Sequence, residues 1–123
     1  MLIELSIIPL GRDSHLSDEI AEVLEIVDAS GLPYQLTPSA TCIEGEWDEV
    51  MALAHLCHAR ARELSPHVIT TIKVEDDGET RDKLTRNVAS VEEKAGRHLG
   101  RIERRMPPAD TRAIAVGLTD APA

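Results

Sequence analysis

Residues 34–49 read YQLTPSATCIEGEWDE, and they decide the fold expected for this chain of 123 residues. Residues 34–37 and 40–44 have the composition of two short strands, and the brief connection between them, which begins at Pro38, is typical of a hairpin. Apolar residues at helical spacing predict a helix directly afterwards, over Trp47–Leu64. A hairpin followed by a helix therefore occupies the middle of the chain.

Further strands and helices lie on both sides of this hairpin. Apolar and β-branched residues alternate in Leu2–Leu10 and His67–Glu75, which predicts two longer strands. Helical periodicity predicts helices over residues 14–30 and from residue 80 to at least residue 95. This order is the split β-α-β arrangement, so we expect an α+β, ferredoxin-like βαββαβ sandwich with an additional C-terminal helix. Right-handed crossovers would place the first and third strands in the middle of the sheet.

The length of the chain fits one domain, which we expect to span residues 1–104. Residues 105–123 are rich in proline, alanine and small polar residues, which predicts a tail that is partly disordered or docks on a neighbouring subunit. Both main helices should cover the same face of the sheet. The opposite face carries Ile8 and β-branched residues of the last strand, and an open apolar face indicates a homo-oligomer, either a dimer or a tetramer.

The charge of the chain excludes several classes of partner. Its formal net charge is −9, from 13 basic and 22 acidic side chains. Nucleic-acid binding needs clustered Lys and Arg, so we expect no nucleic-acid partner, and an anionic membrane surface is equally disfavoured. No apolar run approaches the roughly 20 residues that a membrane span requires, and no signal-peptide pattern is present. We therefore expect a cytoplasmic protein.

The residue types that most often carry catalysis or metal binding show no convincing pattern. Cys42 and Cys57 are too far apart for a CxxC motif, and both are expected to be small buried hydrophobic residues. His55 and His58 have i, i+3 spacing, but a structural zinc site needs four converging ligands, so no metal site is predicted. Trp47 is expected to anchor the core under the sheet. Without a phosphate loop or a catalytic Ser or Cys motif, we predict neither an enzyme nor a required cofactor.

Two motifs resemble the small thiamine-binding protein family, the YkoF-like single-domain proteins. GLPYQLTP at residues 31–38 matches the family pattern G-[LM]-x-Y-x-[LV]-x-P, and TCIEGEWDE at residues 41–49 matches T-x-[IV]-E-G-[ED]-[WF]-[DE]-E. The resemblance covers residue 2 to about residue 95. It departs from the family at Ala40, where members often carry Gly or Asn, and the tail after Arg104 has no counterpart.

This resemblance implies a ferredoxin-like fold, dimers that pair into tetramers, and binding of thiamine or a related pyrimidine without known chemistry. Thiamine carries a permanently positive thiazolium and an aminopyrimidine with donors and acceptors. A site for it needs a carboxylate, hydroxyl or backbone groups, and an apolar wall. The candidate ligand-binding residues are Ser6, Pro9, Tyr34, Ser39, Thr41 and Glu44.

Each of these assignments has a simpler alternative. Glu44 and Glu46 could cap the second helix, where the helix dipole stabilises carboxylates. Ser6 could be a small residue tolerated on a strand, and Tyr34 an ordinary edge-strand residue. For the whole chain, the alternatives are a scaffolding or regulatory oligomer without a small ligand, and an enzyme of unknown substrate with Glu44 as general base.

Overall fold

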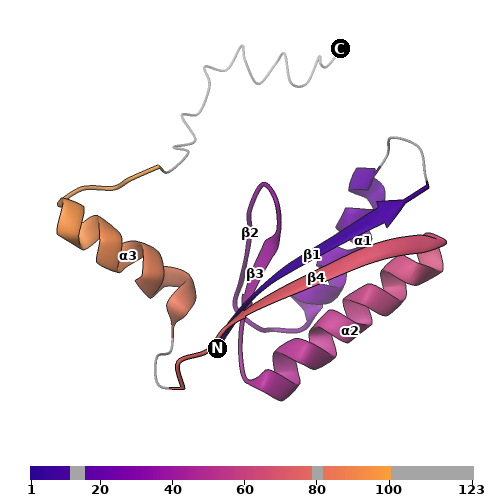
Figure 1. Ribbon diagram of the computed structural model, residues 1–123, viewed down its shortest axis with the longest axis horizontal. Coiled ribbons are helices and arrows are strands. Elements are labelled where there is room, and N and C mark those ends of the chain that lie inside the picture. Colours follow the sequence, from indigo (N-terminus) through magenta and orange to yellow (C-terminus); the bar gives the residue numbers. More distant parts are fainter. Residues whose placement is uncertain (12–15, 79–81, 101–123) are drawn as a thin grey trace, which may run out of the picture. The chain divides into compact units, whose positions relative to one another are not determined.

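The computed structural model describes residues 1–11, 16–78 and 82–100 (Figure 1). The elements follow one another as β1 (Leu2–Leu10), α1 (Leu16–Ala29), β2 (Tyr34–Leu36), β3 (Thr41–Glu44), α2 (Trp47–Leu64), β4 (His67–Glu75) and α3 (Lys83–Ala95). Every predicted element is present, close to its predicted bounds, and the α+β, ferredoxin-like fold is confirmed.

The chain divides into two compact units, Met1–Val91 and Glu92–Ala123. The first contains the sheet, α1 and α2. In the described part of the second, the Glu92 carboxylate accepts a hydrogen bond of 2.8 Å from the N–H of Leu99. The tail predicted for residues 105–123 lies outside the described residues, so the domain boundary at residue 104 stays a prediction.

The four strands form one antiparallel sheet in the order β2-β3-β1-β4, so β3 and β1 lie in the middle as predicted. The pairing of β1 differs on its two sides. β4 pairs with the whole of β1, from Leu2 opposite Glu75 to Leu10 opposite His67. β3 pairs only with residues 2–5. In the described chain, residues 6–10 therefore have a strand neighbour on the β4 side alone.

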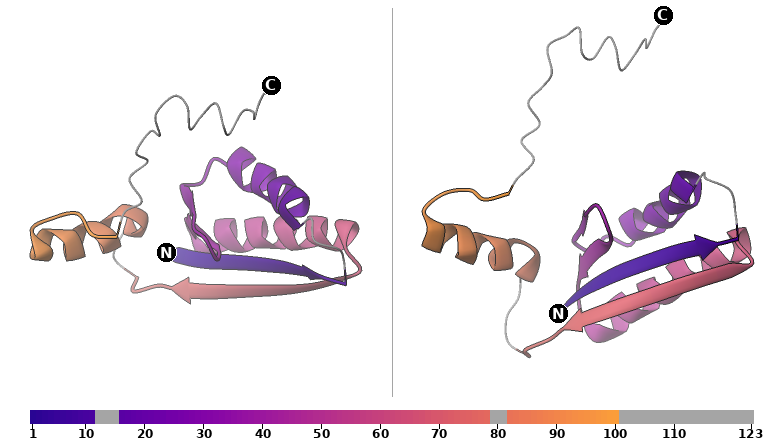
Figure 2. Two further views of the ribbon diagram at one scale, coloured as in Figure 1. Left: turned by 90° about the horizontal axis from the view of Figure 1, so that it is seen from above. Right: turned by 45° about the horizontal axis from the view of Figure 1, so that its top comes forward.

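Helices α1 and α2 cover the same face of this sheet (Figure 2). The side chains between the helices and the sheet are aliphatic or small, as expected from a chain without phenylalanine. The buried core residues are Ile3, Leu5, Val23, Val27, Ile43, Val50, Leu53, Ala54, Cys57 and Ala61. Burial raises the pKa of the Cys57 thiol to about 11, and its predicted role as a small buried hydrophobic residue is confirmed.

Two predictions about single residues are wrong. Trp47 does not anchor the core, because 54% of its surface is exposed. The buried stripe of α2 begins one turn later, at Val50, so the first turn of the helix lies outside the core. Cys42 is only half-buried, because it pairs with Glu4 on the face of the sheet that the helices leave open.

The core assignment predicts a clear difference between two apolar substitutions. Ile43→Ala should lower the free energy of unfolding by about 2–5 kcal/mol, because Ile43 is fully buried and a cavity would remain. Leu56→Ala should change it by no more than about 0.5 kcal/mol, because 59% of Leu56 is exposed. Urea titrations at one protein concentration measure both values. Equal losses in the two variants would contradict the assignment.

Candidate functional site

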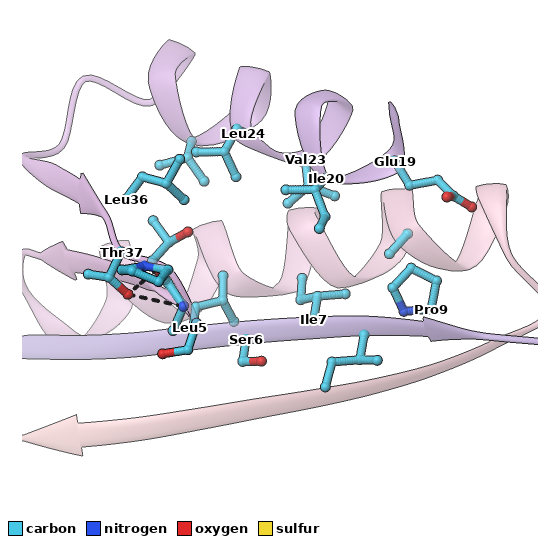
Figure 3. A pocket seen from close by; sticks show the side chains of 17 residues that line it. Leu5, Ser6, Ile7, Pro9, Glu19, Ile20, Val23, Leu24, Leu36 and Thr37 are labelled. Atoms are coloured by element: carbon cyan, nitrogen blue, oxygen red, sulfur yellow. Dashed lines mark hydrogen bonds between the residues drawn. The ribbon is translucent and has the colours of Figure 1, made fainter. Parts of the chain in front are cut away.

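A cavity of about 460 Å³ lies between β1, α1 and the β2–β3 hairpin (Figure 3). Its walls come from residues 5–9 of β1, from the sheet-facing side of α1, from residues 36–41 of the hairpin and from Ala61 of α2. This volume is within the range of about 300–1,000 Å³ that is typical of small-molecule sites. The packing of these elements thus leaves room for a ligand beside the core.

The cavity exists because β1 is longer than the strand beside it. Thr41 pairs with Leu5, and β3 does not extend further along β1. The hairpin turn closes just beyond this point, since Thr37 Oγ1 donates to the carbonyl of Ala40 at 2.8 Å and accepts its N–H at 3.1 Å. None of the strands in the described ranges therefore fills the space next to Ile7 on the β3 side. Figure 3 shows Ile7 pointing from β1 into this space, toward α1.

Apolar side chains form most of the wall. Ile7 and Pro9 contribute from the sheet, and Ile20, Val23 and Leu24 contribute from α1 (Figure 3). Ile20 is exposed even though it belongs to the apolar stripe of its helix, which fits a side chain at the rim of a cavity. Such walls favour flat, weakly polar rings over strongly hydrated ligands.

One charged side chain, Glu19, lines the cavity among the described residues. It lies in the first turn of α1, and only 7% of its surface is exposed. Figure 3 shows it at the end of the cavity near Pro9. A carboxylate in the wall of a largely apolar cavity is a group that can contact a positively charged ligand.

Glu19 was not among the predicted site residues, because an acidic residue in the first turn of a helix is explained by the helix dipole alone. The sequence nevertheless contained a signal. Glu19, Val23 and Val27 follow each other at i, i+4 spacing, and both valines are buried. A carboxylate on the apolar stripe of a helix is the feature that could have identified it.

Four of the six predicted site residues line the cavity, namely Ser6, Pro9, Ser39 and Thr41. Thr41 is buried and Ser39 is exposed, so their hydroxyl groups belong to the inner and outer parts of the wall. The Ser6 side chain lies on the side of β1 away from the helices (Figure 3). The ligand-binding roles of these residues stay predictions.

The other two predicted residues, Tyr34 and Glu44, are not part of the cavity lining. The hydroxyl of Tyr34 donates to Asp28 Oδ1 at 2.8 Å, and this hydrogen bond raises the pKa of the tyrosine. Tyr34 therefore links β2 to the end of α1.

Glu44 caps a helix, although not the helix that the sequence suggested. Its carboxylate accepts the N–H of Lys83 at 2.7 Å and that of Leu84 at 3.4 Å, so it caps the first turn of α3. Helix α2 has its own N-cap residue, Glu46, which forms a capping box with Glu49. The alternative reading of the acidic cluster is thus correct for Glu46, whereas Glu44 acts on the following helix.

The described residues offer no evident site for a metal ion. Among the residues described, no group of three or more His, Cys, Asp or Glu side chains could hold one. Of the two histidines with helical spacing, His58 directs Nδ1 to the hydroxyl of Thr70 at 2.6 Å. A search of the same residues finds no helix long and apolar enough to cross a membrane.

Residues 3–92 match the family model described as thiamine-binding protein. The chain belongs to this family. A UPF0045 protein of Mycobacterium bovis is 34% identical over 93 residues, which cover 75% of this chain and 91% of that protein. The residues that match the family model, 3–92, include both sequence motifs and every residue of the cavity lining.

Solved structures of other proteins share the fold of this thiamine-binding family member. A protein of Methanocaldococcus jannaschii aligns with a TM-score of 0.70 and 22% identity, covering 75% of this chain and 95% of that one. A Thermotoga maritima protein for which a role in thiamine biosynthesis or salvage has been suggested aligns with a TM-score of 0.59 and 20% identity, covering 70% of this chain and 95% of that one.

The capping role of Glu44 leads to a test that does not involve a ligand. Glu44→Ala should lower the free energy of unfolding by about 0.5–2 kcal/mol, the usual cost of losing an N-cap. Amide exchange at Lys83 and Leu84 should become faster, because both N–H groups lose their acceptor. Glu25→Ala, at an exposed position of α1, serves as the control. Unchanged exchange at both amides would contradict this role.

Proposed function

We propose that this chain binds thiamine, or a related cationic compound with a pyrimidine and a thiazole-like ring, in the cavity between β1, α1 and the hairpin. The observation that carries the proposal is the carboxylate of Glu19, which is 7% exposed and lines a cavity with otherwise mostly apolar walls. Membership in the thiamine-binding protein family supports it, as does the suggested thiamine-related role of the Thermotoga maritima protein.

The charge of the ligand sets the first requirement on the site. A thiazolium is permanently positive and cannot lose its charge by releasing a proton. Moving such a cation out of water is costly unless a fixed opposite charge lies nearby, and Glu19 supplies one. Ile7, Val23 and Leu24 then offer apolar surface to the ring faces, while the hydroxyls of Ser39 and Thr41 offer hydrogen bonds.

The first experiment is a calorimetric titration with thiamine. Wild-type protein should give saturable heat, and Glu19→Gln should weaken binding by about 10-fold to 100-fold, because a contact to a charged group contributes roughly 1.5–3 kcal/mol. Asp18→Asn is the matched control, since Asp18 is exposed in the same helical turn and does not line the cavity. Its affinity should equal that of the wild type.

Two outcomes would overturn the proposal in different ways. Absence of binding to folded wild-type protein would remove thiamine as the ligand. Equal affinity of the wild type and Glu19→Gln would remove Glu19 as the counter-charge. Circular dichroism of each variant shows that the comparison concerns folded protein.

The proposed role is that of a non-catalytic carrier, buffer or sensor in the cytoplasm, without a required cofactor. The alternative enzyme would use Glu44 as general base. Two hydrogen bonds from α3 already engage the Glu44 carboxylate, and it is not part of the cavity lining, which favours the binding role. Thiamine recovered unchanged after long incubation with the protein would agree with it.

We also propose that the chain forms a homo-oligomer through the face of the sheet opposite α1 and α2. On this face Ile8 pairs with Ile69 across β1 and β4, and these side chains are 46% and 47% exposed. Two adjacent exposed isoleucines form an apolar patch that a second copy would bury. This surface also suits the alternative of a scaffolding oligomer, which calorimetry with thiamine distinguishes.

Light scattering after size exclusion tests this assembly. Wild-type protein should have the mass of a dimer or tetramer, and Ile69→Glu should reduce it to that of a monomer, since burying the new charge is unfavourable. Leu56→Glu replaces an equally apolar residue that is 59% exposed on α2, and it should leave the mass unchanged. A monomeric wild type would refute the proposed oligomer.

A further inference from the structure

In the described part of the chain, no strand pairs with one backbone edge of the second half of β1, and the bonds of Met1 show which groups this edge presents. The amino group of Met1 donates to Gly45 O at 2.9 Å, and Gly45 N–H donates to Met1 O at 3.0 Å. In an antiparallel pair the N–H and C=O of one residue point to the same side, and the side alternates along the strand. Residues 3, 5, 7 and 9 therefore direct these groups toward the β3 side, and residues 2, 4, 6, 8 and 10 direct them toward β4.

Two independent features agree with this assignment. The carbonyl of Leu10 accepts a hydrogen bond from Ser65 Oγ. Ser65 lies two residues before the start of β4, so this carbonyl points to the β4 side. Proline has no N–H and is tolerated in a strand only where no ladder bond is lost. Pro9 belongs to the set that faces away from β4, so its pairing with Val68 loses no donor.

Because β3 ends opposite Leu5, no strand in the described residues pairs with the N–H and C=O of Ile7 or with the C=O of Pro9. These groups border the cavity. Ser6 and Ile8 belong to its lining, although the Ser6 side chain lies on the opposite face of β1 (Figure 3) and alternation along the strand puts Ile8 on that same face. The cavity therefore reaches the backbone edge itself. An N–H donor and a C=O acceptor thus lie side by side, both directed into a largely apolar space.

We propose that this backbone edge, the N–H and C=O of Ile7 with the C=O of Pro9, selects a 4-aminopyrimidine over a 4-oxopyrimidine. This inference rests on the proposed binding of a thiamine-like ligand. A 4-aminopyrimidine carries a ring nitrogen that accepts beside an exocyclic amine that donates, both in the ring plane. Ile7 N–H pairs with the ring nitrogen, and the carbonyl of Ile7 or Pro9 accepts from the amine.

Glu19 makes this arrangement selective. The carboxylate lies near Pro9 at one end of the cavity and fixes the position of the cationic ring. The pyrimidine is attached to that ring, so it cannot turn over while the cation stays beside Glu19. An oxo group in place of the amine exchanges donor and acceptor, and backbone groups cannot rotate to compensate as hydroxyl groups do.

The test compares thiamine with oxythiamine, which keeps the thiazolium and replaces the amine by an oxo group. Oxythiamine should bind at least about tenfold more weakly, because its mismatched groups leave desolvated backbone groups unpaired. Ile7→Pro removes the N–H that faces the cavity and leaves the ladder to β4 intact. It should bind thiamine about tenfold more weakly and discriminate less between the two ligands. Ile7→Val keeps this N–H and should therefore retain the wild-type ratio of the two affinities.

Amide exchange measured by NMR gives a readout independent of affinity and of the variants. In the free protein the Ile7 amide should exchange at least tenfold faster than those of Ser6 and Ile8, which face β4. Saturation with thiamine should slow it at least tenfold. A slow Ile7 amide in the free protein would overturn the inference, since another segment or a second copy would already occupy the edge.

The remaining outcomes separate the two proposals. If thiamine does not bind, the proposed function fails, whatever the exchange rate of Ile7. If thiamine and oxythiamine bind equally and the Ile7 amide stays fast in the complex, the function stands and the inference is overturned.

Discussion

The unequal pairing of β1 is the constraint on which the candidate site depends. β4 follows this strand over its full length, while β3 stops opposite Leu5. The turn that leads into β3 is held by three hydrogen bonds between Thr37 and Ala40, so the hairpin cannot extend along β1 without losing them. Helix α1 still covers this end of the sheet. Among the described residues, this half of β1 has a strand on one side only, and its position under a helix leaves a cavity with an apolar roof and a polar edge.

The second constraint is the carboxylate of Glu19 on the buried side of α1. Folding alone would favour an apolar residue at this position, one turn before Val23, because a buried charge is costly in a nonpolar environment. Exceptions to a local rule of this kind concentrate at functional sites. Glu44 is also buried, but it lies outside the cavity lining, and its carboxylate accepts two hydrogen bonds from the backbone of α3.

Local patterns were sufficient for the architecture, since periodicity and turn residues predicted every element and the middle positions of β1 and β3. They also led to Pro9 and Thr41, because the adjacency of two strands follows from topology. They failed where contacts between distant residues decide. The position of α3, which engages Glu44, depends on a contact between residues 39 positions apart. The exposure of Trp47 depends on where the core ends along α2, and helical periodicity carries no information about that.

The two constraints act on different parts of the proposed ligand. A carboxylate recognises charge with little directional preference, and it attracts any cation small enough to enter. A strand edge recognises a pattern of donors and acceptors, and it would pair with any peptide or planar ring that reached it. Neither group alone is selective. In one cavity the two groups together favour a cationic ring and a hydrogen-bonding ring at a fixed separation. A compound that joins both rings makes the second contact without a second loss of translational freedom, so it binds more tightly than either ring alone. Selectivity for a linked two-ring cation thus follows from an incomplete strand pair and one buried acid.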